Sequence, residues 1–375
     1  KSIKTVILVS NTSWYLYNYR RPLIIEMINR NINVIAVTPK DDYTDLLKKI
    51  GVNHIDIKIN RKGMNPITDI ILFLNLIKIY HCQNAICIQH YTIKPVIYGS
   101  LAAKVLHFKN VINVIPGLGY VFGNKSNHQK IIKILVKCLY RHTLGVSKVC
   151  MFQNPSDRDY FVKSKIIQIS KTEVTYGSGV DLNYFDFNKC VEKEYGHCTF
   201  LLFGRLLRDK GVLEYVESAR ILKRKYPNAI FNILGFIDDG NPEAILFNEI
   251  EKWKKEKYIN YLGNTDDVRP YIINSDVIVL PSYYNEGVPK SLIEALSIGR
   301  PLITTDRPGC REVINDGKNG IIIQPKNVEQ LVNAIEYMIQ NPDERIRMGI
   351  ESRLYAEIKF DVNKVNEIFF KYMNI

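Results

Sequence analysis

Short apolar runs alternate with longer amphipathic segments along the whole chain. In the first half, apolar runs of strand length occupy residues 5–9, 34–37, 54–57, 85–88, 111–114, 149–152 and 173–176. In the second half they occupy residues 199–203, 230–234, 258–262, 277–280, 302–304 and 320–323. Segments with helical periodicity lie between them, for example residues 20–30, 44–50, 67–81, 97–106 and 212–226. Strands that alternate with helices are typical of parallel sheets, so we expect an α/β protein.

The chain is long enough for two domains. Its 375 residues exceed what one compact core usually holds. Residues 181–197 lack strong periodicity and form the predicted linker. We therefore expect an N-terminal domain over residues 1–182, a C-terminal domain over residues 183–360 and a final helical segment over residues 361–375.

Composition favours a cytoplasmic protein. The longest apolar stretch, residues 67–80, is interrupted by Asp69, Asn75 and Lys78 and is too short to cross a bilayer. Seven cysteines lack the spacing of a disulfide framework, and no signal peptide is visible. These features predict reduced thiols and a cytoplasmic location.

The positive charge is confined to the first half of the chain. The net charge is +13, but residues 1–185 hold 25 Lys and Arg against 10 Asp and Glu, a surplus of +15. Residues 186–375 hold 26 against 28, a balance of −2. A basic domain predicts an acidic partner, such as nucleic acid, anionic lipid or a phosphorylated acceptor.

Residues 125–148 concentrate this charge in one amphipathic segment. Isoleucine, leucine and valine alternate there with Lys130, Lys133, Lys137 and Arg141. The pattern is consistent with a helix that lies on an anionic membrane surface. It is equally consistent with a solvated charged face over a buried apolar one.

The most informative motif is a pair of glutamates, Glu286 and Glu294, separated by seven residues. Pro289 favours a helix that begins at that residue, which places Glu286 in the preceding loop and Glu294 inside the helix. The free N–H groups of a helix start attract anions. A carboxylate beside an anion site suits a nucleotide sugar, which carries both phosphates and hydroxyls. The alternative is an ordinary helix start, where the helix dipole favours acidic residues.

A second motif lies about eighty residues upstream. The apolar strand that ends at Gly204 is followed by Arg205 and Lys210, just before the helix predicted over residues 212–226. Ligands bind at this carboxyl end of the strands in open α/β sheets. A guanidinium and an ammonium group together suit a diphosphate. The alternative for a basic loop is a solvated surface.

With these two motifs the chain resembles the retaining glycosyltransferases of family 4. The resemblance extends over essentially the whole chain and implies the GT-B fold, with two Rossmann-like domains facing across a cleft and a C-terminal helix that crosses back to the first domain. It implies that Arg205 and Lys210 neutralise the donor diphosphate. It also implies that Glu286 contacts the donor sugar at the reacting centre and that Glu294 holds the ribose.

The resemblance therefore implies one catalytic and one donor-binding set. The catalytic set is Glu286, Arg205 and Lys210. The donor-binding set is Arg205, Lys210, Glu286, Gly287, Val288, Pro289 and Glu294, although Pro289 has no N–H to offer.

Two loops after strands of the first half resemble one branch of this family. They are Gln-His-Tyr-Thr-Ile-Lys-Pro at residues 89–95 and Pro-Gly-Leu-Gly-Tyr-Val-Phe-Gly at residues 116–123. That branch extends lipid-linked oligosaccharides in bacterial surface-polysaccharide or glycoprotein assembly. The resemblance implies a UDP-N-acetylhexosamine donor, such as UDP-GalNAc, and an acceptor saccharide on undecaprenyl diphosphate. The expected acceptor-binding residues are Lys94, His90, Gly117, Gly119 and Arg20.

Not every part of the first half follows the family pattern. Residues 10–21 hold aromatic residues and two arginines where many members have a glycine-rich loop. These side chains either bind a sugar or an acceptor phosphate, or they begin a helix with Trp14 and Tyr15 packed inward. His90 is likewise either an acceptor contact or a structural histidine. Residues 306–312 resemble the same branch and are expected to shape the wall of the donor pocket.

We expect catalysis without a metal or another cofactor. Asp157-Arg158-Asp159 matches the Asp-x-Asp string of metal-dependent transferases, but it follows Asn154-Pro155-Ser156 and is predicted to be a helix start. Arg205 and Lys210 would replace the ion.

The chain is thus expected to be a peripheral enzyme at the inner face of the plasma membrane. Its basic N-terminal domain would face the anionic lipid. Two alternatives stay open: a nucleotide-sugar epimerase of the GT-B type, and a basic nucleic-acid-binding protein, although no known nucleic-acid-binding motif is present.

Overall fold

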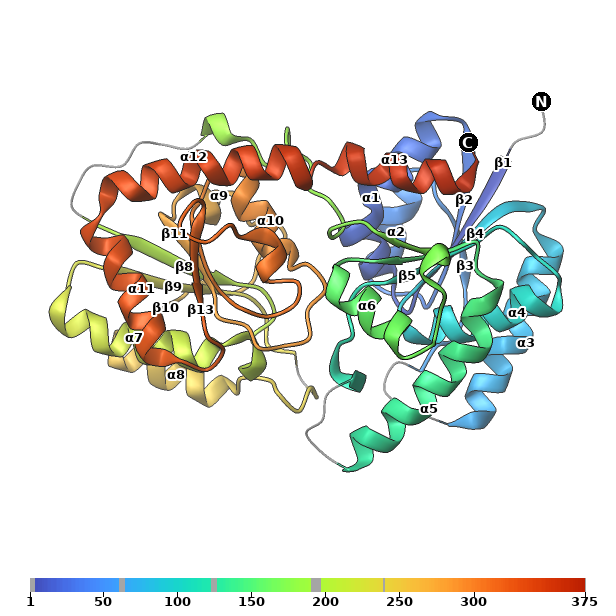
Figure 1. The fold of residues 1–375 in the computed structure, drawn as a ribbon, viewed down its shortest axis with the longest axis horizontal. Coiled ribbons are helices and arrows are strands. Elements are labelled where there is room, and N and C mark those ends of the chain that lie inside the picture. The colour runs from blue at the N-terminus through green and yellow to red at the C-terminus, as the bar shows by residue number, and fades with distance from the viewer. Residues whose placement is uncertain (1–3, 61–64, 123–126, 190–196, 239, 375) are drawn as a thin grey trace. The chain divides into compact units, whose positions relative to one another are not determined.

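The computed structural model describes residues 4–60, 65–122, 127–189, 197–238 and 240–374 (Figure 1). The chain divides into two compact units. The N-terminal unit comprises Lys1–Ser178 and Val362–Ile375, and the C-terminal unit comprises Gly179–Asp361. The domain boundaries expected at residues 182 and 360 lie within four residues of these divisions.

The N-terminal unit contains a seven-stranded parallel sheet in the order β3-β2-β1-β4-β5-β6-β7. The strands are β1 (Lys4–Val9), β2 (Ile32–Thr38), β3 (Asn53–Asp56), β4 (Ala85–Tyr91), β5 (Val111–Ile115), β6 (Val149–Phe152) and β7 (Thr172–Val174). Its α-helices are α1 (Ser13–Asn29), α2 (Thr44–Lys49), α3 (Pro66–Cys82), α4 (Ser100–Val105), α5 (Asn127–Thr143), α6 (Pro155–Lys163) and α13 (Val362–Met373). Shorter turns are the π-helix η1 (Pro95–Gly99) and the 3-10 turns η2 (Tyr120–Phe122), η3 (Leu144–Val146) and η4 (Ile169–Lys171).

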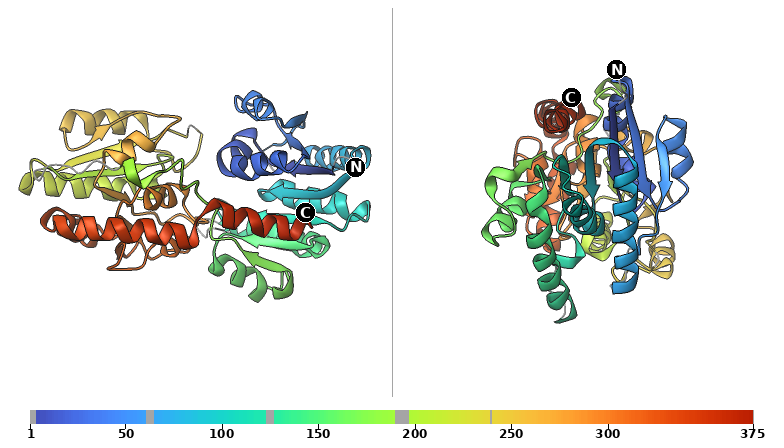
Figure 2. Two further views of the ribbon diagram at one scale, coloured as in Figure 1. Left: turned by 90° about the horizontal axis from the view of Figure 1, so that it is seen from above. Right: turned by 90° about the vertical axis from the view of Figure 1, so that its right-hand side faces the viewer.

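Helices cover both faces of this sheet (Figures 1 and 2). Successive side chains of a strand point to opposite faces. Val6 and Leu8 of β1 therefore pack on one face with α1 and α13, whereas Ile7 and Val9 pack on the other with α3 and α4. Both faces are thus filled, as expected for an all-parallel sheet.

The C-terminal unit contains a six-stranded parallel sheet in the order β10-β9-β8-β11-β12-β13. The strands are β8 (Thr199–Phe203), β9 (Ile230–Leu234), β10 (Asn260–Tyr261), β11 (Val277–Leu280), β12 (Leu302–Thr305) and β13 (Gly320–Ile323). Its α-helices are α7 (Val212–Lys225), α8 (Phe247–Glu256), α9 (Arg269–Ile273), α10 (Lys290–Ser297), α11 (Val328–Gln340) and α12 (Pro342–Lys359). Its 3-10 turns are η5 (Phe187–Lys189), η6 (Arg208–Lys210) and η7 (Arg311–Val313).

All thirteen predicted strands are present, with their ends shifted by at most three residues. The expected final helix is confirmed as α13, which belongs to the N-terminal unit although it follows the C-terminal unit in the chain. Phe369 and Phe370 of α13 are buried in the core that α1 shares, and Glu367 forms an ion pair with Arg30 at 2.7 Å. No helix among the described residues is long and apolar enough to cross a membrane.

The start of the first helix was predicted wrongly. Helix α1 begins at Ser13, seven residues before the predicted start, and Thr12 caps it by accepting a hydrogen bond from the Tyr15 N–H at 3.1 Å. Pro22, a residue usually found in the first turn of a helix, lies well inside α1. The aromatic segment at residues 13–19 is therefore helical, with Tyr15 packed inward.

Candidate active site

Three loops meet at the carboxyl edge of the C-terminal sheet. Strands β8, β11 and β12 are parallel neighbours, so the loops that follow them leave the sheet at the same edge. These loops are residues 204–211, 281–289 and 306–310, and each contains residues that the sequence singled out. Tyr283 N–H and Tyr284 N–H both donate to the Asp209 carbonyl, at 2.8 and 2.9 Å, which joins the first two loops.

The predicted catalytic residues Lys210 and Glu286 form an ion pair across these two loops. Lys210 Nζ contacts Glu286 Oε1, and the two side chains are only 13% and 10% exposed. Lys210 ends η6, and Gly211 follows with a positive φ of 78°. A side chain at Gly211 would collide with the Pro281 carbonyl, so glycine allows the basic loop to lie against the loop after β11. The fold thus brings together two residues that are 76 positions apart.

Ser282 holds this ion pair in place, and the sequence did not reveal it. Its buried hydroxyl contacts the Asp209 carbonyl and Glu286 Oε1, both at 3.2 Å. The Ser282 carbonyl in turn accepts a hydrogen bond from the Thr305 hydroxyl on β12. Ser282 therefore links the basic loop, the glutamate and the third strand. The only sequence signal is a serine two residues after the end of β11, and serine is common in loops.

The helix after Glu286 begins one residue later than predicted. Pro289 has an extended backbone with ψ of 120° and precedes the first residue of α10, Lys290. Proline thus stands at the N-cap instead of the first helical position. Glu286 lies in the loop and Glu294 in the helix, as predicted. Glu294 is buried beside Lys290 at 3.4 Å, and burial raises the pKa of its carboxyl group.

The third loop packs tightly against the glutamate loop. Gly309 has a φ of 84°, and a Cβ atom there would lie 1.4 Å from the Gly287 carbonyl oxygen. Cys310 follows, fully buried, and burial raises the pKa of its thiol to about 12. Gly287, Val288 and Pro289 are all buried in this arrangement. Residues 306–310 thus pack against the glutamate loop by close backbone contact, and their role in a donor-pocket wall stays a prediction.

Arg205 lies beside this centre on a less enclosed surface. It follows Gly204 at the end of β8, and its guanidinium contacts Asp238 Oδ2 at 3.4 Å. Its side chain is 36% exposed. An exposed ion pair of this kind contributes little to stability, so Arg205 can exchange Asp238 for another anion at small cost.

The arrangement offers charge of both signs within one enclosed edge. Lys210 carries a nearly buried ammonium group, Arg205 carries a guanidinium that is open to solvent, and Glu286 and Glu294 supply carboxylates. Cations in a partly desolvated site stabilise negative charge that develops on a leaving group. Carboxylates accept hydrogen bonds from sugar hydroxyls. The edge can therefore bind a phosphorylated sugar and assist the departure of its phosphate.

His90 is a structural histidine and does not reach a ligand. It is fully buried at the end of β4. Asn113 donates to the Ser100 and Ser147 hydroxyls, so its Oδ1 is left to accept from His90 Nδ1 at 2.7 Å. His90 Nε2 then accepts from the Tyr80 hydroxyl at 2.8 Å. The acceptor-binding role expected for His90 is therefore wrong, because both ring nitrogens are used inside the protein.

We expect His90 to stay neutral throughout the physiological pH range. Burial lowers its pKa to about 4, despite the hydrogen bond to Asn113. Its ring signals in two-dimensional ¹H–¹⁵N NMR should keep the Nδ1–H pattern from pH 8 to pH 5. A His90 midpoint near the ordinary value of about 6.5 would show that the ring is accessible and would restore its acceptor role.

Arg20, another expected acceptor-binding residue, is also buried. Its guanidinium lies 5.0 Å from the centre of the Tyr91 ring and 5.1 Å from that of the Phe369 ring. It is 1% exposed, and its Nε and Nη2 atoms have no hydrogen-bond partner within the described part of the chain. Two aromatic faces compensate part of the cost of burying a charge. In this structure Arg20 therefore stabilises the contact between α1, β4 and α13.

Lys94 lies in an internal ion pair. Its Nζ contacts Asp69 Oδ1 on α3 at 2.5 Å, and the Tyr98 hydroxyl donates to Asp69 Oδ2 at 2.9 Å. The side chains of Lys94 and Asp69 are 16% and 12% exposed. The lysine charge is thus already neutralised, so an acceptor diphosphate would have to compete with Asp69 for it.

The backbone around Lys94 is strained. Thr92 has a φ of 70°, a conformation that β-branched residues rarely adopt. Its buried Oγ1 has no hydrogen-bond partner among the residues that the structure describes. The π-helix η1 follows directly. Strained residues and π-turns are enriched at functional sites, so this strand end is a candidate for one.

The second strand-end loop is held by a buried aspartate. Gly117 and Gly119 both have positive φ, of 149° and 59°. Between them, Leu118 N–H donates to Asp157, and burial raises the Asp157 pKa to about 7. Asp157 lies in the first turn of α6, where its N–H donates to the Asn154 Oδ1 cap at 2.8 Å. The Asp-x-Asp string is therefore a helix start, as predicted. Gly123, at the end of the predicted loop, lies outside the described residues.

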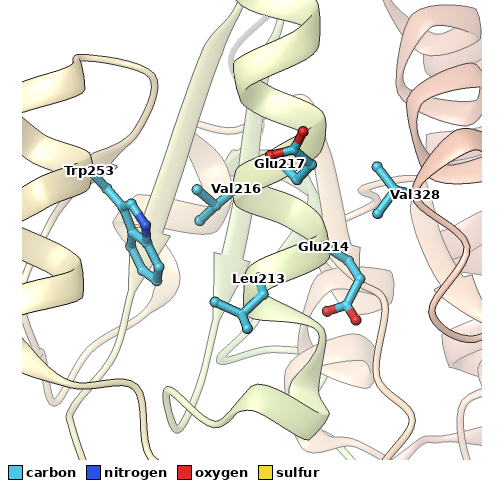
Figure 3. A pocket seen from close by; sticks show the side chains of 6 residues that line it. All are labelled: Leu213, Glu214, Val216, Glu217, Trp253 and Val328. Atoms are coloured by element: carbon cyan, nitrogen blue, oxygen red, sulfur yellow. The ribbon is translucent and has the colours of Figure 1, made fainter.

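A hollow of about 380 Å³ lies elsewhere on the C-terminal unit (Figure 3). Its walls are α7, Trp253 of α8 and Val328 at the start of α11. It contains none of the predicted donor-binding residues. Among the described residues, no group of three or more His, Cys, Asp or Glu is placed to hold a metal ion.

Two protein-family models match the chain. Residues 5–149 match the family described as glycosyl transferase 4-like, and residues 190–355 match glycosyl transferases group 1. The chain belongs to the group 1, family 4 glycosyltransferases. This glycosyltransferase is therefore a retaining enzyme that uses a nucleotide-sugar donor.

Two similar proteins have names that specify a lipid-linked acceptor. The N,N'-diacetylbacillosaminyl-diphospho-undecaprenol alpha-1,3-N-acetylgalactosaminyltransferase of Campylobacter jejuni is 27% identical over 97% of this chain and 96% of its own. The UDP-Gal:alpha-D-GlcNAc-diphosphoundecaprenol alpha-1,3-galactosyltransferase of Escherichia coli is 24% identical over 73% of this glycosyltransferase and 71% of its own chain.

Solved structures confirm the GT-B fold. A glycosyltransferase from Rickettsia africae has a TM-score of 0.79 at 20% identity and covers 100% of this chain and 98% of its own. Anabaena HepE in complex with UDP-glucose has a TM-score of 0.79 at 14% identity and covers 99% of both chains. The prediction of two Rossmann-like domains with a C-terminal helix returning to the first is thus confirmed.

Proposed function

We propose that the enzyme transfers an N-acetylhexosamine, such as GalNAc or GlcNAc, from a UDP-sugar to a saccharide linked to a lipid diphosphate. The Lys210–Glu286 pair carries this proposal, because it places a cation and a carboxylate together at the edge where family members bind the donor. The named activities of the Campylobacter and Escherichia proteins support the lipid-diphosphate acceptor. The Anabaena complex supports a UDP-linked donor.

On the donor side, Arg205 and Lys210 stabilise the charge that builds on the UDP diphosphate as its bond to the sugar breaks. Glu286 orients the donor sugar and stabilises its oxocarbenium-like state. Glu294 accepts hydrogen bonds from the ribose, and the backbone around Gly287 and Val288 lines the pocket. The acceptor hydroxyl attacks from the face that the diphosphate leaves and gives its proton to the departing phosphate, so the anomeric configuration is retained. The two cations perform this work without a metal ion.

On the acceptor side, Gly117 and Gly119 allow the saccharide to approach the backbone closely, and Lys94 contacts the acceptor diphosphate after leaving Asp69. The strained Thr92 and the π-helix beside Lys94 support a ligand-responsive strand end. The surplus charge of the first half attracts the anionic membrane that holds the acceptor. The product belongs to a bacterial surface glycan, such as a capsule or O-antigen, made at the inner face of the plasma membrane.

The test is UDP release from a panel of UDP-sugars in the presence of EDTA, with and without a detergent-solubilised diphosphate-linked saccharide acceptor. We expect release from a UDP-N-acetylhexosamine only when the acceptor is present. Acceptor-independent conversion of the sugar would instead indicate an epimerase. A folded protein that binds no UDP, but binds nucleic acid with a steep salt dependence, would overturn the assignment.

A further inference from the structure

A hollow of about 530 Å³ lies at the amino edge of the N-terminal sheet. Strands β5, β6 and β7 are parallel neighbours, so the segments that enter them lie at this same edge. Lys109 lies two residues before β5, and Lys148 and Lys171 lie directly before β6 and β7. The fold therefore gathers three lysines that are far apart in the sequence around one hollow.

The ends of two helices complete a basic lining. Lys104 lies in the last turn of α4, and His142 lies in the last turn of α5. The described residues that line the hollow include no aspartate or glutamate. The basic residues of this amino-edge hollow are Lys104, His107, Lys109, His142, Lys148 and Lys171.

Two of the lysines are oriented by neutral groups. Lys171 Nζ donates to the Gly145 carbonyl at 2.6 Å. Lys148 Nζ donates to the Tyr372 carbonyl at 2.6 Å and to Asn374 Oδ1 at 2.9 Å. Lysines often bind carbonyls near helix ends, so these contacts alone could be structural. They do not cancel the charge, however, and an ammonium group has three N–H donors, so each lysine keeps at least one for a ligand.

The other two lysines of the hollow have no internal partner. Lys104 and Lys109 are exposed, and neither forms an ion pair or a side-chain hydrogen bond with another described residue. Glu173, the acidic residue nearest to Lys171 in the sequence, accepts a hydrogen bond from the Tyr372 hydroxyl at 2.9 Å. The positive charge of the hollow is therefore not neutralised by carboxylates of its lining.

A concave site lined by charges of one sign concentrates the oppositely charged ligand. Lysine binds phosphate as a point charge, and small-molecule sites usually have volumes of about 300–1,000 Å³. We propose that the amino-edge hollow binds a soluble anion that carries several phosphate groups, such as an oligophosphate or a nucleoside triphosphate.

This inference goes beyond the proposed function and does not depend on it. The expected acceptor contacts Lys94, Gly117 and Gly119 follow strands β4 and β5, so they lie at the carboxyl edge of the same sheet. The amino-edge hollow lies at the opposite edge. Its ligand is therefore a molecule other than the sugar donor or the acceptor, and the site stands or fails separately from the transferase reaction.

Calorimetric titration with inorganic tripolyphosphate, in 0.1 M NaCl without divalent metal, tests the inference. We expect saturable binding by the wild type. Lys104→Gln with Lys109→Gln should weaken this binding at least about tenfold, because two charge-assisted contacts are lost. The matched control, Lys130→Gln with Lys137→Gln on α5, removes the same charge from the same unit outside the hollow. It should bind as the wild type does.

A second variant separates this site from the donor site. Lys210→Met removes a cation of the C-terminal unit, and it should keep the binding event that the Lys104, Lys109 variant loses. Loss of all tripolyphosphate binding in Lys210→Met would assign the anion to the donor site alone and would overturn the inference.

Chemical footprinting of the wild type locates the anion without any substitution. Tripolyphosphate should protect Lys104 and Lys109 from acetylation, as measured by mass spectrometry, and should leave the exposed Lys130 reactive. Equal acetylation of Lys104 and Lys109 with and without the anion would contradict the site, whether or not the substituted proteins fold.

Three further outcomes would overturn the inference. The first is the absence of saturable binding by the wild type. The second is an equal loss of affinity in the α5 control, which would assign the effect to the overall charge of the unit. The third is displacement of tripolyphosphate by vesicles of phosphatidylglycerol, which would assign the hollow to lipid headgroups instead of a soluble anion.

Discussion

Replacing Lys210 with methionine should lower kcat by about 10²- to 10³-fold, the usual effect of removing one group that stabilises developing negative charge. The side chain is almost enclosed and contacts Glu286 directly. It therefore acts where solvent screens charge least. Single-turnover measurements at saturating donor would separate this loss from weaker binding. Activity near the wild-type level would show that Lys210 does not stabilise the departing diphosphate.

The same substitution should also destabilise the fold, by about 3 kcal/mol, because it leaves the Glu286 carboxylate buried without its partner. The double variant Lys210→Met, Glu286→Gln should recover most of this free energy of unfolding, as measured with urea. It should remain inactive. The control is Lys225→Met, which breaks a solvent-screened pair with Glu336 and should leave the free energy of unfolding nearly unchanged. Equal losses for both single variants would contradict the burial of the Lys210–Glu286 pair.

Replacing Gly309 with alanine should have the second large effect. Alanine in the left-handed conformation costs about 1–2 kcal/mol by itself. At Gly309 the new Cβ atom would also lie 1.4 Å from the Gly287 carbonyl oxygen, which forces the loop that carries Glu286 to move. We expect a total loss of at least about 3 kcal/mol of unfolding free energy and a marked loss of UDP affinity by calorimetry.

Gly317 offers the matched control. Its φ of 73° is close to the 84° of Gly309, but a Cβ atom there meets no other atom within 4 Å. Gly317→Ala should therefore cost only the backbone term, about 1–2 kcal/mol, with UDP affinity unchanged. If the two alanine variants lost the same stability and UDP affinity, the contact between the third loop and Gly287 would not hold the glutamate loop in place.

The meeting of the two predicted donor-side loops at one sheet edge was predictable, because each motif is local in sequence. Arg205 and Lys210 follow one strand and Glu286 follows another, and neighbouring parallel strands deliver such loops to the same edge. The hydrophobic period located every strand for the same reason: both faces of each sheet are buried. Sequence spacing alone did not reveal Ser282, because its role depends on the Asp209 carbonyl brought next to it by the fold.

The acceptor side was less predictable because burial is a tertiary property. His90 lies near the end of β4 and Arg20 lies inside α1. Asn113 and Tyr80 enclose His90, and Phe369 covers Arg20. Phe369 comes from α13, more than 300 residues further along the chain. The exposed aliphatic residues of α3, such as Ile70 and Leu74, were missed for a related reason. A periodic pattern does not predict which apolar stripe of a helix faces the sheet.

The most direct test of the account is the rate of UDP release from a UDP-N-acetylhexosamine in EDTA, with the lipid-diphosphate acceptor present, for the wild type, Lys210→Met and the Lys225→Met control. The account predicts acceptor-dependent release by the wild type and the control. For Lys210→Met it predicts a rate that is lower by a factor of at least about 10². Release that requires an added divalent metal, or a Lys210→Met rate equal to that of the control, would contradict it.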